Sequence, residues 1–464
     1  MEQPGHDERP SSGRDGILLK RLSGGINRAI IVAVAAQGMQ FGAALTLVPF
    51  MVTRLSPAEV GIWYVFVGIQ ALAIICDFGF LPSFTRAFAL AHAGAEALAT
   101  QGLEGGSLIG RPTNQRLLAE VMRAAKLFYR FLGIAIIVAG LGFGLPYVTH
   151  LAAAGGLSVE RAQLAWGIFT IGIGLNLALQ WVGPALLGTG RIEQNYLVII
   201  TNRGGFSLLG IAALLAGGGL VALSGAMIVS QVIARLLAGW FLRGVGGGHA
   251  DRAAVHAILR TLWPNAARMG AVLISGFFIT RYGLFAVSTF AGLAAGGSYA
   301  LSLQMLNAVA AVSQLPMQVT MPRLVAARVA HERARLRRMY VTAMVGYFAL
   351  YLTGAALVIL VVPMMLGTIG SKVTLLPVAM LGLMAVILML EGFHSNAAFF
   401  ITTGNDVPFV RAAVISGVLI AAGTTLAGWL GLGIAAMIAW QGIVQLAYNN
   451  WRWPVMAWKE IAES

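Results

Sequence analysis

Long apolar stretches constrain this sequence more than any other feature. About twelve stretches approach or exceed the 20 or so apolar residues that a helix needs to span the hydrocarbon core of a membrane. They run from Ile30 to Val52, Gly61 to Leu81, Leu132 to Leu151, Gln163 to Leu187, Tyr196 to Ala216, Leu220 to Leu242, Met269 to Phe290, Gly292 to Leu315, Val341 to Leu366, Leu375 to Phe400, Val410 to Leu430 and Leu432 to Trp451.

Composition agrees with this pattern. Of the 464 residues, 58% are hydrophobic and 10% are charged, whereas soluble domains carry about 25% charged residues. A soluble fold could not bury so much apolar surface. The sequence therefore predicts an all-α, polytopic membrane protein with about twelve transmembrane helices.

Basic residues gather in alternate connections between the apolar stretches. The formal charge is +14, but the basic segments contain no nucleic-acid-binding motif, so no nucleic-acid partner is expected. Under the positive-inside rule, this asymmetry places both termini in the cytoplasm. The outward turns hold only Arg54, Arg161 and Lys372. The inward segments hold Arg9, Arg14, Lys20, Arg21, Arg28, Arg86, Arg111, Arg116, Arg123, Lys126, Arg243, Arg252, Arg260, Arg268, Arg323, Arg328, Arg333, Arg335, Arg337 and Arg338.

The even number of stretches predicts two lobes of six helices. The expected organisation is a cytoplasmic tail (1–28), an N-terminal lobe (29–242), a cytoplasmic linker (243–268), a C-terminal lobe (269–452) and a cytoplasmic C-terminal tail (453–464). Two copies with an even number of spans have parallel orientation, so a pseudo-twofold axis is expected along the membrane normal.

Three features recur in the same order in the two halves. Gly61 and Gly297 each precede an aromatic residue by two positions. The second and eighth stretches each run into a proline, Pro82 or Pro316, and then into a basic segment. The turn at Gly190 corresponds in position to the turn at Gly404.

These motifs resemble the polysaccharide flippase family, in the superfamily that also contains multidrug and toxin exporters and the lipid II flippase. The resemblance covers most of the chain. It is carried by Thr53 to Trp63, Asp77-Phe78-Gly79 leading to Thr85-Arg86, Gly190-Arg191, Gly297 to Ser302, Pro316 and Pro322-Arg323.

The resemblance implies two lobes around a central cavity in a bacterial inner membrane. It also implies translocation of a polyprenyl-pyrophosphate-linked oligosaccharide for O-antigen, capsule or exopolysaccharide assembly. Membrane lipids are further expected partners, and a polysaccharide polymerase with its chain-length machinery is a candidate partner.

Ionisable residues within the apolar stretches are the candidate functional residues, because a charged side chain at the bilayer centre costs about 2.5–3.5 kcal/mol on insertion scales. Arg281 lies about twelve residues into its stretch, roughly 18 Å deep, whereas Arg203 and Arg235 can reach toward an interface. These three arginines are the predicted substrate-binding residues. Glu391 and Asp77 are the candidates for coupling to H+ or Na+; no metal site and no other cofactor is expected.

Three arginines against two carboxylates predict a cationic interior that suits an anionic, phosphate-bearing substrate. Polar residues of the apolar stretches are candidates for lining the path: Gln37, Gln40, Gln70, Asn176, Gln180, Gln231, Gln304, Asn307, Gln314, Gln441 and Gln445.

We therefore expect a flippase that works by alternating access. The nearest alternative is a multidrug exporter of the same superfamily, although cationic drugs would favour an excess of carboxylates. A membrane-embedded polysaccharide polymerase or ligase is a second alternative, and a noncatalytic scaffold a third. The short outward turns and the lack of a nucleophile or nucleotide-binding motif argue against an enzyme.

Overall fold

The computed structural model describes residues 42–43, 45–98, 111–245, 251–404 and 408–463. These residues form helices and no strands. The first lobe contains the helix Leu45–Arg54, α2 (Pro57–Ile75), α3 (Phe80–His92), α4 (Gln115–Ala139), α5 (Leu145–Ala154), α6 (Val159–Ala178), α7 (Val182–Gly188), α8 (Ile192–Leu215) and α9 (Gly219–Phe241). The second lobe contains α10 (Arg252–Thr280), α11 (Tyr282–Phe290), α12 (Leu293–Ser313), α13 (Leu315–Val329), α14 (Arg333–Leu360), α15 (Val362–Thr368), α16 (Val378–Ile401), α17 (Val410–Trp429), α18 (Gly433–Ala447) and α19 (Asn449–Glu463).

The predicted all-helical membrane fold is confirmed. Eight helices of the described part are long and apolar enough to cross a membrane, and nine if the bent pair Val272–Thr280 and Tyr282–Phe290 is one span. The remaining predicted stretches are also helical where described. They fall outside this count because Leu45–Arg54 is short, α18 has 15 residues, and α12 carries several small and polar side chains.

Some predicted boundaries differ from the helices. The predicted linker is helical from Arg252, because it forms the first half of α10. The predicted C-terminal tail belongs to α19 as far as Glu463, the last described residue. The predicted N-terminal tail, Gln37, Gln40, residues 246–250 of the predicted linker and residues 405–407 lie outside the described residues.

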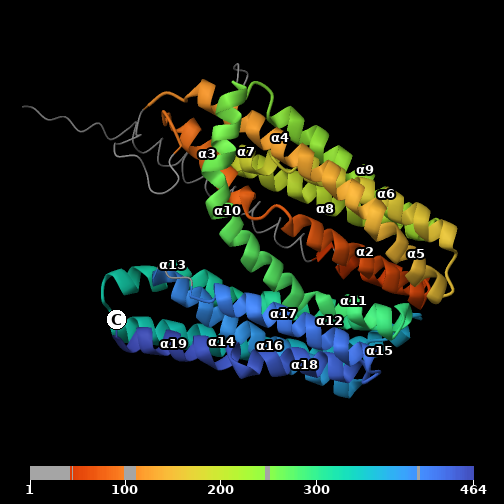
Figure 1. The fold of residues 1–464 in the computed structure, drawn as a ribbon. Coiled ribbons are helices and arrows are strands. Elements are labelled where there is room, and N and C mark those ends of the chain that lie inside the picture. The colour runs from red at the N-terminus through yellow and green to blue at the C-terminus, as the bar shows by residue number, and fades with distance from the viewer. Residues whose placement is uncertain (1–41, 44, 99–110, 246–250, 405–407, 464) are drawn as a thin grey trace, which may run out of the picture.

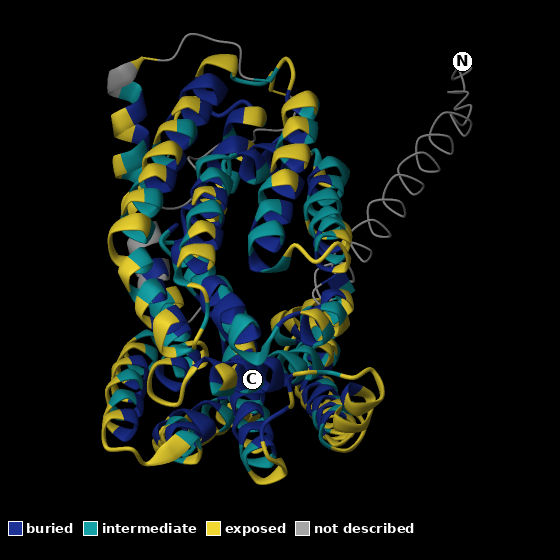
Figure 2. Ribbon diagram, turned by 90° about the vertical axis from the view of Figure 1, so that its right-hand side faces the viewer, coloured by how far each residue is buried: buried dark blue, intermediate teal, exposed yellow. Residues whose placement is uncertain are grey.

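Exposed apolar side chains lie on the outer faces of both lobes. Phe143, Val329 and Trp429 are each at least 75% exposed. Figure 2 shows exposed positions alternating with buried ones along many helices. In a soluble protein such a surface would be a large aggregation liability, whereas in a bilayer it contacts lipid. The chain is a polytopic membrane protein.

The two lobes meet at one end and diverge toward the other (Figure 1). We call the end where α2 and α12 begin the closed end. We call the opposite end, which carries α3, α13 and the arginines of residues 323–338, the basic end. At the basic end α10 crosses from the second lobe to contact α3 and α4 of the first.

A capping box starts α2 at the closed end. The Ser56 hydroxyl accepts a hydrogen bond from the Glu59 amide, and the Glu59 carboxylate accepts one from the Ser56 amide. Pro57 occupies the first turn, where a missing N–H costs nothing. The capping box therefore fixes where the helix starts, and so the height at which Gly61 meets the second lobe.

Glycines allow α2 and α12 to cross at backbone contact. A Cβ on Gly61 would overlap the carbonyl oxygen of Leu293, and a Cβ on Gly297 would lie 3.0 Å from the carbonyl oxygen of Pro57 and 3.1 Å from the amide nitrogen of Gly61. Gly61 thus packs on Leu293, four residues before Gly297, and Gly297 packs on Pro57, four residues before Gly61. The two members of the predicted repeat meet each other across the lobes.

Candidate functional site

A cavity of about 360 Å³ lies between the lobes, just beyond the glycine crossing. It draws residues from the first helix, α2, α6, α8 and α9 of the first lobe, and from the α10–α11 break, α11 and α12 of the second. Its lining is Leu45, Leu47, Met51, Trp63, Tyr64, Val67, Gly68, Gln70, Ile74, Asn176, Asn202, Arg203, Phe206, Met227, Ser230, Gln231, Arg281, Leu284, Ala300, Leu303, Gln304, Asn307 and Ala308.

The charge in the cavity is entirely positive within the described part of the chain. Arg203 and Arg281 line it, one from each lobe, and its described lining contains no carboxylate. Gln70, Gln231 and Asn307 add amide groups. The cavity therefore offers two guanidinium groups and several neutral hydrogen-bonding groups to whatever occupies it.

A break in the helix places Arg281 on the cavity. Arg281 lies between α10 and α11, and the segments Val272–Thr280 and Tyr282–Phe290 are bent by 40° there. Its amide still donates to the Phe277 carbonyl at 2.8 Å, so the backbone stays hydrogen-bonded through the bend. The break lets a charged side chain leave the helix toward polar space rather than toward lipid.

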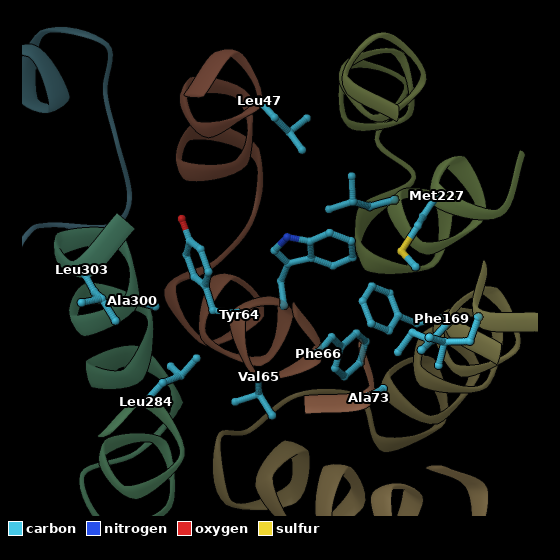
Figure 3. Close-up of a cluster of buried hydrophobic side chains, with 14 of the residues drawn as sticks. Leu47, Tyr64, Val65, Phe66, Ala73, Phe169, Met227, Leu284, Ala300 and Leu303 are labelled. Atoms are coloured by element: carbon cyan, nitrogen blue, oxygen red, sulfur yellow. The ribbon is translucent and has the colours of Figure 1, made fainter. Parts of the chain in front are cut away.

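Two aromatic residues after Gly61 close the cavity toward the closed end. The Tyr64 hydroxyl donates to the Gln304 side-chain oxygen at 2.6 Å and thereby joins the lobes. Trp63 stacks on Phe206, with ring centroids 6.1 Å apart, and meets Phe169 edge-on at 5.4 Å. Figure 3 shows Tyr64 on the side of Leu303 and Ala300, and Phe169 on the opposite side within the first lobe.

Arg235, the third predicted arginine, is not part of the cavity lining. Its guanidinium donates to the side-chain oxygen of Asn176 at 2.8 Å, and Asn176 itself lines the cavity. Arg235 therefore lies behind the wall and orients Asn176. Its Nε has no hydrogen-bond partner among the described groups.

Glu391 is buried in the second lobe, away from the cavity lining. Its carboxylate accepts a hydrogen bond from Gln441 at 2.7 Å. Tyr299 interacts electrostatically with both Glu391 and Arg281, and neither of these charges belongs to an ion pair among the described residues. Buried Tyr299 is therefore near both the carboxylate and the cavity arginine.

Asp77 lies at the turn between α2 and α3, also outside the cavity lining. One carboxylate oxygen accepts a hydrogen bond from the Leu81 amide at 3.0 Å, which satisfies a free donor in the first turn of α3. Its other oxygen is buried near the Tyr129 hydroxyl but makes no hydrogen bond of good geometry with the described groups. This geometry gives Asp77 a clear structural role in capping α3.

Several cavity residues escape prediction from the sequence. Asn202, Phe206 and Ser230 lie on faces of α8 and α9 that only the tertiary packing identifies. Tyr64 carried a signal, because it directly follows the Gly61 and Trp63 motif. Among the predicted polar residues, Gln70, Asn176, Gln231, Gln304 and Asn307 line the cavity, whereas Gln180, Gln314, Gln441 and Gln445 do not.

Comparison with solved structures identifies the fold. An inward-facing multidrug resistance MATE family transporter of the MOP superfamily is 17% identical and aligns over 94% of this chain and 99% of its own, with a TM-score of 0.64. An outward-facing conformation of such a transporter is also 17% identical, with a TM-score of 0.53 over 94% of this chain and 95% of its own. A MATE protein in complex with Br-NRF is 16% identical, with a TM-score of 0.51 over the same shares.

No family model and no curated protein matches the sequence. At such low identity the structural matches establish the fold alone, which this chain shares with solved transporters of the MOP superfamily. The higher TM-score belongs to the inward-facing structure. The lobe arrangement of this chain, closed at one end and divergent at the other, is thus more similar to that conformation.

Proposed function

We propose that the protein is a flippase for lipid-linked oligosaccharides, and that the cavity binds the anionic pyrophosphate headgroup. The observation that carries this proposal is the presence of Arg203 and Arg281 in a cavity whose described lining lacks a carboxylate. A guanidinium group binds phosphate oxygens through two parallel hydrogen bonds. The neutral amides around it suit sugar hydroxyl groups.

The shape of the molecule supports alternating access. The glycine crossing and the Tyr64–Gln304 hydrogen bond close one end, while the lobes diverge toward the basic end. We place the basic end in the cytoplasm, following the positive-inside rule. The headgroup then enters from the cytoplasmic leaflet of a bacterial inner membrane, the polyprenyl chain stays in lipid, and the closed end opens to release the headgroup.

A multidrug exporter is the second candidate function. It is favoured by a specific observation, because the solved proteins that share this fold include multidrug resistance transporters. The cavity charge argues against cationic drugs, since two arginines without a described carboxylate would repel them. Anionic drugs would satisfy the same electrostatics.

Reconstitution separates the two functions. Purified protein in liposomes should move polyprenyl-pyrophosphate-linked oligosaccharide between leaflets, measured by its accessibility to a membrane-impermeant reagent. The same liposomes should not accumulate ethidium, a cationic dye. Ethidium transport without lipid translocation would establish the exporter and end the flippase proposal; empty liposomes and an unrelated membrane protein provide the controls.

Glu391 is the residue that we propose for coupling to H+ or Na+, since it is a buried carboxylate with one neutral partner. In Glu391→Gln, transport driven by a cation gradient should fall to the rate measured without a gradient. A carboxylate is neutralised when it binds H+ or Na+, whereas a neutral amide is not. The measurement is transport into liposomes with and without an imposed gradient. Glu160→Gln, at an exposed carboxylate, should respond as the wild type does; a normal gradient response in Glu391→Gln would remove Glu391 from the mechanism.

Asp77 is the weaker coupling candidate. Its capping hydrogen bond to Leu81 explains its burial without a bound cation.

A polymerase and chain-length machinery stay proposed partners, with no surface of the described residues assigned to them.

A further inference from the structure

A second hollow, of about 1160 Å³, lies at the closed end, on the far side of the glycine crossing from the cavity. We refer to it as the outer hollow. Its walls come from the end of the first helix, the start of α6, the α8–α9 turn and the loop between α15 and α16. Both lobes therefore contribute to it.

Three cations from distant parts of the chain converge on the outer hollow. Arg54, Arg161 and Lys372 all line it. They are also the only basic residues in the turns that are predicted to face outward. Topology disfavours positive charge at that side of a membrane, and yet the basic residues placed there gather around one hollow. Such an arrangement indicates a function for their charge.

The charge of the outer hollow is not balanced by its acidic residue. Glu59 is the carboxylate in the described lining, and it is held by the Ser56 amide in the capping box. None of the three cations belongs to an ion pair among the described residues. All three are exposed at the surface of the hollow. A ligand with two negative charges would restore neutrality.

Small residues leave space for such a ligand. The wall between α8 and α9 is the run Gly217–Gly219, and Gly370 stands opposite in the second lobe. A Cβ at Gly217 or Gly370 would meet no atom within 4 Å. The hollow is therefore open next to its cations rather than filled by side chains.

Lys372 already ties the two lobes together at this place. Its amide donates to the Val52 carbonyl at 2.7 Å, and its ammonium group lies 3.4 Å from the Arg54 carbonyl. The Arg54 carbonyl belongs to the last turn of a helix, where carbonyls lack helical partners. An anion beside Lys372 would contact the first lobe through Arg54 and Arg161.

We infer that the outer hollow binds a phosphate-class anion, and that the anion stabilises the closed arrangement of the two lobes. Arg54 and Arg161 supply guanidinium groups from the first lobe, and Lys372 supplies an ammonium group from the second. A phosphate oxygen accepts from both types of donor. The anion is free phosphate or pyrophosphate, or the phosphate group of a lipid. This inference stands whether or not the transported substrate is a lipid-linked glycan.

Calorimetric titration of the purified protein with inorganic pyrophosphate, at constant ionic strength, tests binding. Arg161→Gln should weaken binding about tenfold, because a charge-assisted hydrogen bond is lost. Arg161 is chosen because, among the described contacts, its side chain makes no hydrogen bond between the lobes. The variant should therefore fold. Arg338→Gln, an exposed arginine at the basic end, is the matched control and should bind as the wild type does.

Pyrophosphate could also bind in the central cavity, so Arg281→Gln is titrated in parallel. Binding that survives in Arg281→Gln but weakens in Arg161→Gln supports the inference. Binding that is lost only in Arg281→Gln overturns it, as does equal binding by Arg161→Gln and wild type. These outcomes leave the flippase proposal intact, because that proposal depends on the central cavity.

A distance measurement tests the conformational effect. Spin labels at Ala154→Cys and Met364→Cys, two exposed positions at the closed end, report the lobe separation in a Cys76→Ser background. Pyrophosphate should increase the short-distance population in the wild type and not in Arg161→Gln. In phosphatidylcholine nanodiscs, the same change on adding phosphatidic acid would identify a lipid phosphate as the source; no change with either anion overturns the inference.

Discussion

Replacement of Gly61 by alanine is expected to separate the two lobes at the closed end. The new Cβ would overlap the carbonyl oxygen of Leu293, and backbone cannot move aside as a flexible side chain can. Overpacking of a close contact costs about 1–3 kcal/mol, so the ratio of closed to open molecules should fall about 5- to 150-fold. Spin labels at residues 154 and 364 should report a longer distance, and transport should slow because the closed state is depleted.

Gly225→Ala is the control for this experiment. Gly225 also lies within a helix, but a Cβ there would meet nothing within 4 Å. Alanine is favoured over glycine in a helix interior by about 1 kcal/mol, so the control should be at least as stable as the wild type. An unchanged label distance in Gly61→Ala would show that the crossing does not hold the closed end together.

Arg281→Gln is expected to cause the largest loss of transport among single changes in the cavity. A hydrogen bond to a charged group contributes about 1.5–3 kcal/mol, so headgroup affinity should fall about 10- to 150-fold. Arg281→Lys keeps the charge but loses the planar guanidinium group that binds two phosphate oxygens. Its headgroup affinity should therefore lie between that of the wild type and that of Arg281→Gln. Lipid translocation into liposomes at several substrate concentrations measures the effect.

The Arg281 series needs a control for folding. Arg281 is held in place by its backbone, whose amide bonds to Phe277, so the α10–α11 break should persist in the variants. Thermal stability in detergent should therefore stay close to wild type, and Arg338→Gln should transport normally. Normal translocation by Arg281→Gln would mean that the cavity arginine does not bind the headgroup.

The sequence predicts the helices well because their apolar stretches are long. A chain that must satisfy its backbone within the bilayer has few alternatives to a helix. Arg281 and Arg203 both line the cavity, as expected for charges in apolar stretches, which need a polar environment. That both arginines line one cavity depends on the tertiary fold, because α8 and the α10–α11 break lie far apart in the sequence.

Arg235 shows where such reasoning stops. Gln231 and Arg235 are four residues apart on α9, and yet Gln231 lines the cavity while Arg235 bonds to Asn176 behind it. A polar side chain on α9 can be satisfied either by the cavity or by a hydrogen bond to α6. Which of the two occurs depends on where α6 lies, and no pattern within α9 encodes the position of α6.

The contact between Gly61 and Gly297 is reciprocal. Each glycine lies against the residue four positions before its counterpart, so each lobe presents the same patch to the other. A contact in which both partners supply the same surface is the kind that a symmetric homodimer forms. The crossing therefore has the form of an isologous contact, to which each lobe contributes a glycine and the backbone of the residue four positions before it.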